Sequence, residues 1–419
     1  MVTSVLLIGV FIGLLITLHE FGHLVVAKLS HIPVESFSIG FGPVVIRKRI
    51  GETEYRLSLI PLGGYIKMAG EEDSSVRGFS DKPTGIRIAV VAAGPFFNLI
   101  LGFAIMVGMY LVFGLKYVKP VIYHEVNSSA AMTGLQAGDC ILTVDQETIP
   151  DFETLERVLE RNRGREITLK VLRESIPVVV NYLVPDSLEI EPLVAPVVDR
   201  VRSGSPAEKI GLKPGDKIVA IAGVPVKRWA DFVELVMQNA GNRIEIVYER
   251  NGVVFLDSIT PVAVHDQLTS ERFGQIGVWV RLPKRKVSLP LALWEAVRRT
   301  GYIVVQTFVI IYKVITHQVS SRAIGGPIMV AKIAYEGASW GAEYFLALWA
   351  LLSINLFVVN MLPVPVLDGG RILLDLIAGI RRRRLTNKEI AWANNIGWIL
   401  IGLLVIFTLY NDLMRLIRK

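Results

Sequence analysis

His19-Glu20-Phe21-Gly22-His23 lies inside an apolar segment that covers about residues 5–29. Residues four apart share one face of a helix, so the two imidazole rings of this HExxH pattern can bind one metal ion. Glu20 can reach a water on that metal without binding the metal itself. Ionisable side chains in a membrane segment are costly and usually mark a functional site. The alternative is that the two histidines only pack between helices beside a carboxylate.

The composition indicates a membrane protein that also carries soluble parts, because 52% of its 419 residues are hydrophobic and 20% are charged. The net charge is +7, but the basic residues cluster beside apolar segments, which favours membrane orientation over nucleic-acid binding. Cys140 is the only cysteine, which excludes an intramolecular disulfide. No Lys or Arg precedes Lys28, so we expect a first membrane span rather than a removable signal peptide.

Four segments are long enough to cross a bilayer, which requires about 20 residues. They are residues 5–29, 88–115, 344–362 and 390–410. Basic residues gather between the first two segments and between the last two, where 381–384 is a run of arginines. The positive-inside rule therefore predicts that both loops are cytoplasmic and that both termini and the long central region lie outside. The arginine run could alternatively bind acidic lipid or a partner.

Residues 289–315 are ambiguous, because their longest uncharged part, 300–312, is too short to cross a bilayer comfortably. We expect a helix that lies along the outer membrane surface. This interpretation keeps Asp368, just past the third span, at the same depth as His19 and His23. An additional crossing near residue 305 would reverse the direction of the third span and move Asp368 away from that depth.

The central region contains a repeat with an offset of 77 residues. SSA at 128–130 and GLQAGD at 134–139 recur as SPA at 205–207 and GLKPGD at 211–216, and Arg173 matches Arg250. Each copy predicts a short helix, a glycine turn, strands and an amphipathic helix (152–160 and 229–238). Two α+β modules follow, at about 118–192 and 193–281.

Residues 34–68 carry an apolar side chain at every second position in 37–41 and 55–59, and glycines interrupt the segment, which predicts β-hairpins. We expect this β-structure to dip into the protein at membrane depth, where it must be buried or line a wet cavity. A second polar cluster lies in NMLPVPVLDGG at 360–370, whose prolines end the preceding helix. Its Asp368 would complete a His, His, Asp site, a donor set that favours Zn2+, or would instead be a helix cap or an interfacial anion.

HEFGH on the first span and the NxxPxPxLDG pattern near the third resemble the site-2 protease family of intramembrane zinc metalloproteases. GPFFN at 94–98 and PLGGY at 61–65 match the family pattern too, and the repeat resembles tandem PDZ domains with GLxxGD elements. With two such modules between spans two and three, the chain resembles the bacterial regulator-of-sigma-E type, which cleaves anti-sigma factors. The resemblance implies a polytopic α-helical membrane protein with four transmembrane helices, membrane re-entrant β-hairpins and two periplasmic α+β PDZ domains.

The expected domains are a membrane part (1–117, with a cytoplasmic-side β-loop at 34–68), two PDZ domains (118–192 and 193–281), a periplasmic surface helix with a linker (282–341) and a second membrane part (342–419). The resemblance implies that His19, His23 and Asp368 bind zinc and that Glu20 is the general base. It implies that Asn360 holds the substrate or its oxyanion. The implied residues of the substrate groove are Asn98, Pro61, Gly63, Gly64 and Tyr65. Both asparagines could instead only form interhelical hydrogen bonds.

The implied function is cleavage of transmembrane segments of single-span proteins, such as anti-sigma factors or signal-peptide remnants, after prior trimming. It would serve regulated intramembrane proteolysis and envelope stress signalling in the bacterial inner membrane, with the lipid bilayer and no nucleic acid as partner. No GLGF-type carboxylate loop is evident in either module, and the family suggests a size filter instead. The alternatives are a membrane-anchored PDZ scaffold with a structural metal site, and a metal transporter, for which the four spans show no inverted repeat.

Overall fold

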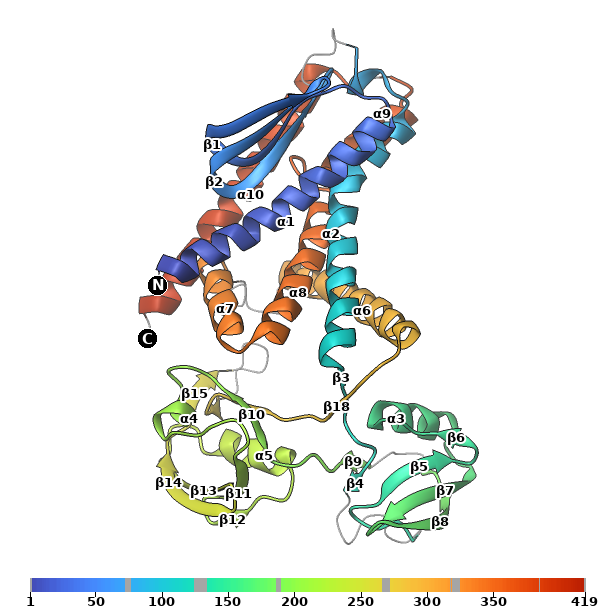
Figure 1. Ribbon diagram of the computed structural model, residues 1–419, viewed down its shortest axis with the longest axis vertical. Helices are drawn as coiled ribbons and strands as arrows, with labels where there is room; N and C mark the ends of the chain where they lie inside the picture. The colour runs from blue at the N-terminus through green and yellow to red at the C-terminus, as the bar shows by residue number, and fades with distance from the viewer. Residues whose placement is uncertain are drawn as a thin grey trace. The chain divides into compact units, whose positions relative to one another are not determined.

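The computed structural model describes residues 2–71, 77–123, 134–185, 190–265, 272–316, 318, 325–383 and 385–417. The chain divides into two compact units (Figure 1). One consists of Met1–Val112 and Ser288–Lys419, and the other of Phe113–Val287.

The first unit is mainly helical. Its helices are α1 (Val2–Leu29), α2 (Thr84–Phe113), α6 (Leu289–Ile315), α7 (Pro327–Ser339), α8 (Ala342–Asn360), α9 (Asp368–Ile380) and α10 (Asn387–Ile417), with the 3-10 turn η1 (Phe79–Asp81). Among the described residues, α2, α8 and most of α10 are long and apolar enough to cross a membrane. Helix α1 has 28 residues, and its role as the first span stays a prediction.

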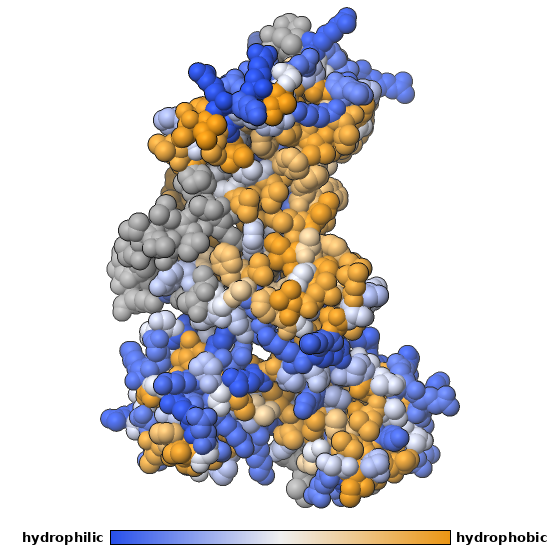
Figure 2. All heavy atoms as spheres, viewed as in Figure 1, coloured by the Kyte–Doolittle hydropathy of each residue, from blue (hydrophilic) through white to orange (hydrophobic). Residues whose placement is uncertain are grey.

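Apolar side chains cover much of the helical surface that Figure 2 shows for this unit, and hydrophilic ones gather at the end with the β1–β2 turn and α9. On α10, Ile399, Leu403 and Ile406 are exposed. Helix α2 begins before its predicted span and ends two residues short of it, while α10 extends past both ends of its predicted span. Hydropathy marks the apolar part of a helix, and a helix can continue past that part. The predicted helix at 289–315 is confirmed as α6, and small residues let it pack on α2 and α8 through Ala296 and Ala350.

Segment 282–341, predicted as a surface helix and a linker, contains a second helix, α7, in its linker part. The Asp412 carboxylate on α10 accepts hydrogen bonds from the backbone amides of Gly326, Ile328 and Met329, at 3.0, 3.0 and 3.1 Å. These are the amides that lack partners at a helix start. Because the capping residue, Asp412, lies far from α7 in the chain, no local sequence pattern predicts the start of α7.

The predicted β-structure at 34–68 is present as two long, bent strands, β1 (Val34–Ile50) and β2 (Thr53–Met68). Phe37 pairs with Ile66 on one side and with Tyr55 on the other, so the two strands fold into four adjacent segments. In the order of pairing these are 44–50, 53–58, 34–41 and 60–68. Segment 60–68 is therefore an outer segment.

The second unit contains two small sheets of the same strand order, β6-β5-β7-β8 and β12-β11-β13-β14. Each repeat has its own buried core, one drawn from residues 122–184 and the other from 198–276. The predicted amphipathic helices are α3 (Phe152–Arg161) and α5 (Trp229–Gln238), and α4 (Pro206–Lys209) is the short helix of the second repeat. The short helix expected near residue 130 lies outside the described residues.

The strands of the first repeat are β4 (Ile122–Tyr123), β5 (Cys140–Val144), β6 (Glu147–Thr148), β7 (Glu166–Arg173), β8 (Ile176–Leu183) and β9 (Glu191–Pro192). Those of the second are β10 (Val198–Val201), β11 (Lys217–Ile221), β12 (Val224–Pro225), β13 (Ile244–Arg250), β14 (Val253–Ile259), β15 (Val262–His265), β16 (Arg272–Gln275) and β17 (Val278–Val280). At the ends of the unit, β3 (Leu115–Lys116) pairs with β18 (Lys284–Arg285).

An ion pair explains the repeated GLxxGD pattern. In the first repeat, Arg173 donates two hydrogen bonds to the Asp139 carboxylate, at 2.8 and 2.7 Å. In the second, Arg250 does the same to Asp216, at 2.7 Å for both. Each arginine also donates to the carbonyl of the glycine that opens the pattern. Both aspartates are buried, so the pair fixes the glycine turn on the neighbouring strand.

The ion pair also links stability to pH. Burial alone would raise the pKa of the Asp216 carboxyl, but hydrogen bonds from Arg250 and from the Lys213 amide hold that pKa below its ordinary value. A lowered pKa in the folded state means that the pair stabilises the fold at neutral pH. This contribution is lost only as the pH falls below about 4.

We expect Arg250→Met to lower the free energy of unfolding of the second repeat by about 2–3 kcal/mol, because it leaves a buried carboxylate without its counter-ion. The measurement is urea-dependent proteolysis of the full chain at sites within 193–281. The exposed Arg243→Met is the matched control. Equal unfolding midpoints for the two variants would show that the ion pair does not stabilise the turn.

Candidate metal centre

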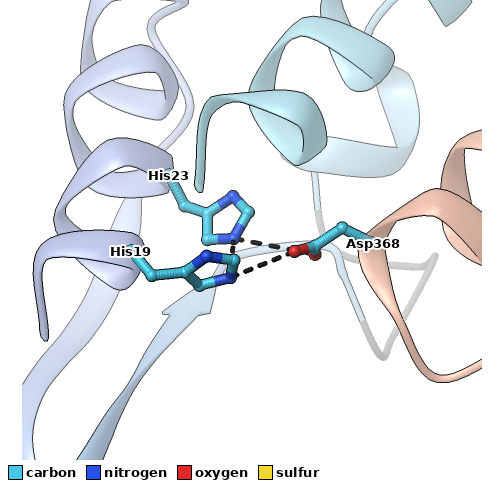
Figure 3. A group of neighbouring side chains, drawn as sticks. All are labelled: His19, His23 and Asp368. Carbon is cyan, nitrogen blue, oxygen red and sulfur yellow. Dashed lines mark hydrogen bonds and ion pairs between the residues drawn. The ribbon is translucent and has the colours of Figure 1, made fainter. Parts of the chain in front are cut away.

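Helices α1 and α9 bring His19, His23 and Asp368 together (Figure 3). His19 and His23 lie one turn apart on α1, and Asp368 is the first residue of α9. The His19 Nε2 atom is 3.3 Å from His23 Nε2 and 3.0 Å from Asp368 Oδ2, and His23 Nε2 is 3.7 Å from Asp368 Oδ1. The three side chains that the HExxH and LDG motifs predicted therefore converge.

These distances fit a tetrahedral zinc site. Zn–N and Zn–O bonds of about 2.0–2.2 Å at tetrahedral angles separate the ligand atoms by about 3.3–3.5 Å. The three separations in the structure, 3.0, 3.3 and 3.7 Å, lie on both sides of that range and within it. Two imidazoles and one carboxylate are also the ligands of many catalytic zinc sites, in which the fourth position is left for water or substrate. We conclude that His19, His23 and Asp368 can hold Zn2+.

Helix α2 supports both imidazoles with one face. Val90, Gly94 and Asn98 are spaced by four residues and so lie along one stripe of that helix. The His23 Nδ1–H donates to the Val90 carbonyl at 2.8 Å, and His19 Nδ1 lies 3.2 Å from Asn98 Nδ2. A Cβ atom at Gly94 would lie only 2.2 Å from His23 Nε2, so only glycine fits between them.

A cavity of about 470 Å³ opens beside the three ligands. Predicted residues that line it are Glu20, Asn360 and Tyr65. Gly64 lies beside Glu20, because a Cβ there would be 3.6 Å from Glu20 Cγ, while Gly63 contacts the Phe41 ring. Pro61 belongs to β2, but its side chain lies outside the described set.

The structure places Asn98 differently from the prediction of a groove residue. Its side chain is fully buried, faces His19 and does not line the cavity. The sequence predicts that Asn98 lies on a helix face, four residues after Gly94. It does not predict that this face meets α1 rather than a groove.

Comparison with known proteins agrees with the site. The model of Peptidase family M50 matches residues 7–404. The chain belongs to the M50 peptidase family. The predicted resemblance to site-2 proteases and the predicted enzyme class, a zinc metalloprotease, are thereby confirmed.

Relatives of this M50 peptidase match it over nearly their full length. The regulator of sigma-E protease of Escherichia coli strain K12 is 35% identical, and the match covers 97% of each chain. That of Salmonella typhimurium strain LT2 is also 35% identical with the same coverage. A Neisseria meningitidis protein named as a zinc metalloprotease is 32% identical over 96% of this chain and 97% of its own.

Sequence reasoning missed a set of charged residues that holds the third ligand of this M50 peptidase. Asp368, Arg371 and Asp375 lie on one face of α9 at i, i+3 and i+7. Arg371 forms an ion pair with Glu71, just past β2, and Asp375 forms one with Arg87 on α2, at 3.1 Å. This face thus ties the metal ligand to both the hairpin and α2. The spacing of the three charges after LDGG was the signal that could have revealed it.

We expect the pair Arg87–Asp375 to show coupling in a double-mutant cycle. Both side chains are mostly buried, so Asp375→Asn or Arg87→Gln alone should each lower stability by about 2–3 kcal/mol, with a smaller additional loss when both are changed. Thermal unfolding of the solubilised full chain measures this. Simple addition of the two single losses would mean that the pair does not hold α9.

Proposed function

We propose that this protein is an intramembrane zinc endopeptidase that cleaves transmembrane segments of single-span proteins. The observation that carries the proposal is the convergence of His19, His23 and Asp368 beside Glu20 in one cavity, on helices of a largely apolar unit. Zinc, when bound, supplies a Lewis acid that makes a water nucleophilic near neutral pH. The relatives are named for regulation of sigma-E, which supports substrates of the anti-sigma factor type and a role in envelope stress.

Glu20 and Asn360 take the other chemical roles in this proposal. Glu20 accepts the proton of the attacking water as the C–O bond forms, and passes it to the leaving amine nitrogen as the peptide C–N bond breaks. The Asn360 amide lines the same cavity, where it can donate a hydrogen bond to the developing oxyanion. Both residues sit on helices, which hold a reacting group more rigidly than loops do.

The outer segment of the hairpin supplies a way to hold the substrate. A transmembrane helix hides its peptide bonds in its own hydrogen bonds, so it must unwind before it is cut. Segment 60–68 pairs with 34–41 on one side, and no described strand pairs with its other side. Its Tyr65 and Ile66 line the catalytic cavity, so an unwound substrate can add there as another strand. Substrates with helix-weakening residues are then favoured.

The proposed location is the bacterial inner membrane, with four crossings formed by α1, α2, α8 and α10. The basic residues support an orientation in which both termini and the two PDZ modules, 118–192 and 193–281, are periplasmic and α6 lies on the outer surface. The modules would act as a size filter that admits substrates already shortened by another protease. This role rests on the family resemblance and on the lack of a carboxylate-binding loop pattern.

We expect Glu20→Gln to lower the rate of cleavage by about 10²–10⁴-fold while zinc stays bound, because the amide cannot accept the proton. The assay compares wild type and variant on a single-span model substrate and measures zinc in both. A membrane-anchored scaffold would cleave in neither form, and a transporter would move metal. Either result would reject the protease.

We expect deletion of residues 118–281 to permit cleavage of full-length substrates, because the deletion removes the filter and leaves the metal ligands in place. Cleavage of intact and pre-trimmed versions of one model substrate is compared in wild type and in the deletion variant. Wild type should cut only the trimmed form. If the deletion variant cuts the trimmed form but still rejects the intact one, the modules are not a filter.

A further inference from the structure

We infer that Asn98 is a positioning residue that fixes the metal-binding tautomer of His19, and that it does not contact the substrate. The inference rests on the proposed metal site, since it concerns how one ligand of that site is held. Its starting point is a fully buried amide, 79 residues from His19 in the chain, whose side chain forms one hydrogen bond among the described residues, with His19 Nδ1 at 3.2 Å.

The direction of that contact follows from what the metal requires. The Nε2 atoms of His19 and His23 face each other and Asp368, so a metal ion among the three must bind at Nε2. A neutral imidazole carries its one hydrogen on the other nitrogen when it binds metal through Nε2. His19 Nδ1 is then a donor, and it needs an acceptor.

Asn98 Oδ1 is the acceptor at hand. The oxygen and nitrogen of an amide exchange places when the group turns by 180°. In the orientation with Nδ2 toward His19, the contact with His19 Nδ1 requires that nitrogen to be the acceptor, and Oδ1 has no partner among the described residues. With the amide turned, Oδ1 accepts from His19 Nδ1–H and leaves Nε2 free for the metal. Such partners of ligating histidines are common in metal sites.

The neighbouring ligand already shows this arrangement. A backbone carbonyl can only accept, so the 2.8 Å contact between His23 Nδ1 and Val90 O makes His23 Nδ1 the donor. Val90 and Asn98 lie at the two ends of one stripe of α2, with Gly94 between them. One helix face therefore offers an acceptor to each imidazole, a carbonyl to one and an amide oxygen to the other.

A direct role in the groove does not fit the same position. Asn98 is 0% exposed and does not line the catalytic cavity. Its backbone carbonyl accepts a hydrogen bond from Ser353 Oγ on α8, at 2.7 Å, which joins α2 to α8 at this residue. Ser353 is also fully buried. Its hydroxyl donates to the Asn98 backbone and not to the side-chain amide, which makes it a matched control.

The test measures zinc affinity by chelator competition on purified full-length protein, in wild type, Asn98→Ala, Asn98→Asp, Ser353→Ala and His19→Ala. We expect Asn98→Ala to weaken zinc binding by about 10–100-fold. Asn98→Asp has nearly the same volume and can only accept, so it should keep affinity within a few-fold of wild type. Ser353→Ala should match wild type. At saturating zinc, Asn98→Ala should leave the KM for a model substrate unchanged.

Three results would overturn the inference: wild-type zinc affinity in Asn98→Ala, affinity in Asn98→Asp as low as in Asn98→Ala, or a raised KM with unchanged zinc affinity. If Asn98→Ala does not fold, the comparison of Asn98→Asp with wild type decides alone, and a loss above tenfold rejects the acceptor role. A failure of the metal site itself looks different. Wild type and His19→Ala would then bind zinc equally.

Discussion

Helices α1 and α2 approach so closely beside the imidazoles that a Cβ atom at Gly22 would lie 2.5 Å from the Ala93 carbonyl oxygen. Gly94 opposes His23 in the same interface. Small residues allow such contact between helices in an apolar medium, where burial of apolar surface drives little association. The contact brings the acceptors of α2 within reach of His19 and His23. Without it, the two rings would be free to rotate and the metal site would lose its geometry.

The third ligand is positioned by charge rather than by close packing. Asp368 begins α9, and the ion pairs of Arg371 and Asp375 fix that helix against both the hairpin and α2. Two ties on one face set the rotation of a helix about its axis, which decides where its first side chain points. The ion pair between Arg371 and Glu71 also connects the helix of the metal ligand to the end of β2. Glu71, which pairs with Arg371, also lines the cavity, as do Tyr65 and Ile66 of segment 60–68.

Much of the site was readable in the sequence, because its chemistry needs few residue types at fixed spacing. HExxH specifies a helix face, and LDG supplies an anion. The repeat is recognisable because the same residues recur at a constant offset. The hairpin followed from alternation and glycines. The structure adds what depends on tertiary contact. Helix α7 is capped by Asp412 of α10, and the orientation of Asn98 depends on which helix faces it. Neither partner is near in sequence.

The origin of the ligands has a thermodynamic consequence. Two come from the first helix of the chain and one from its last quarter, so no local segment can bind the metal with the full set. Any free energy of zinc binding to the three side chains is therefore also free energy that holds α1 and α9 together. The ion pair between Arg87 and Asp375 acts in the same direction, because it joins α2 to α9 whether or not a metal is bound. Metal and ion pairs thus stabilise the same arrangement of helices, in which Glu20 lines one cavity with the three metal ligands.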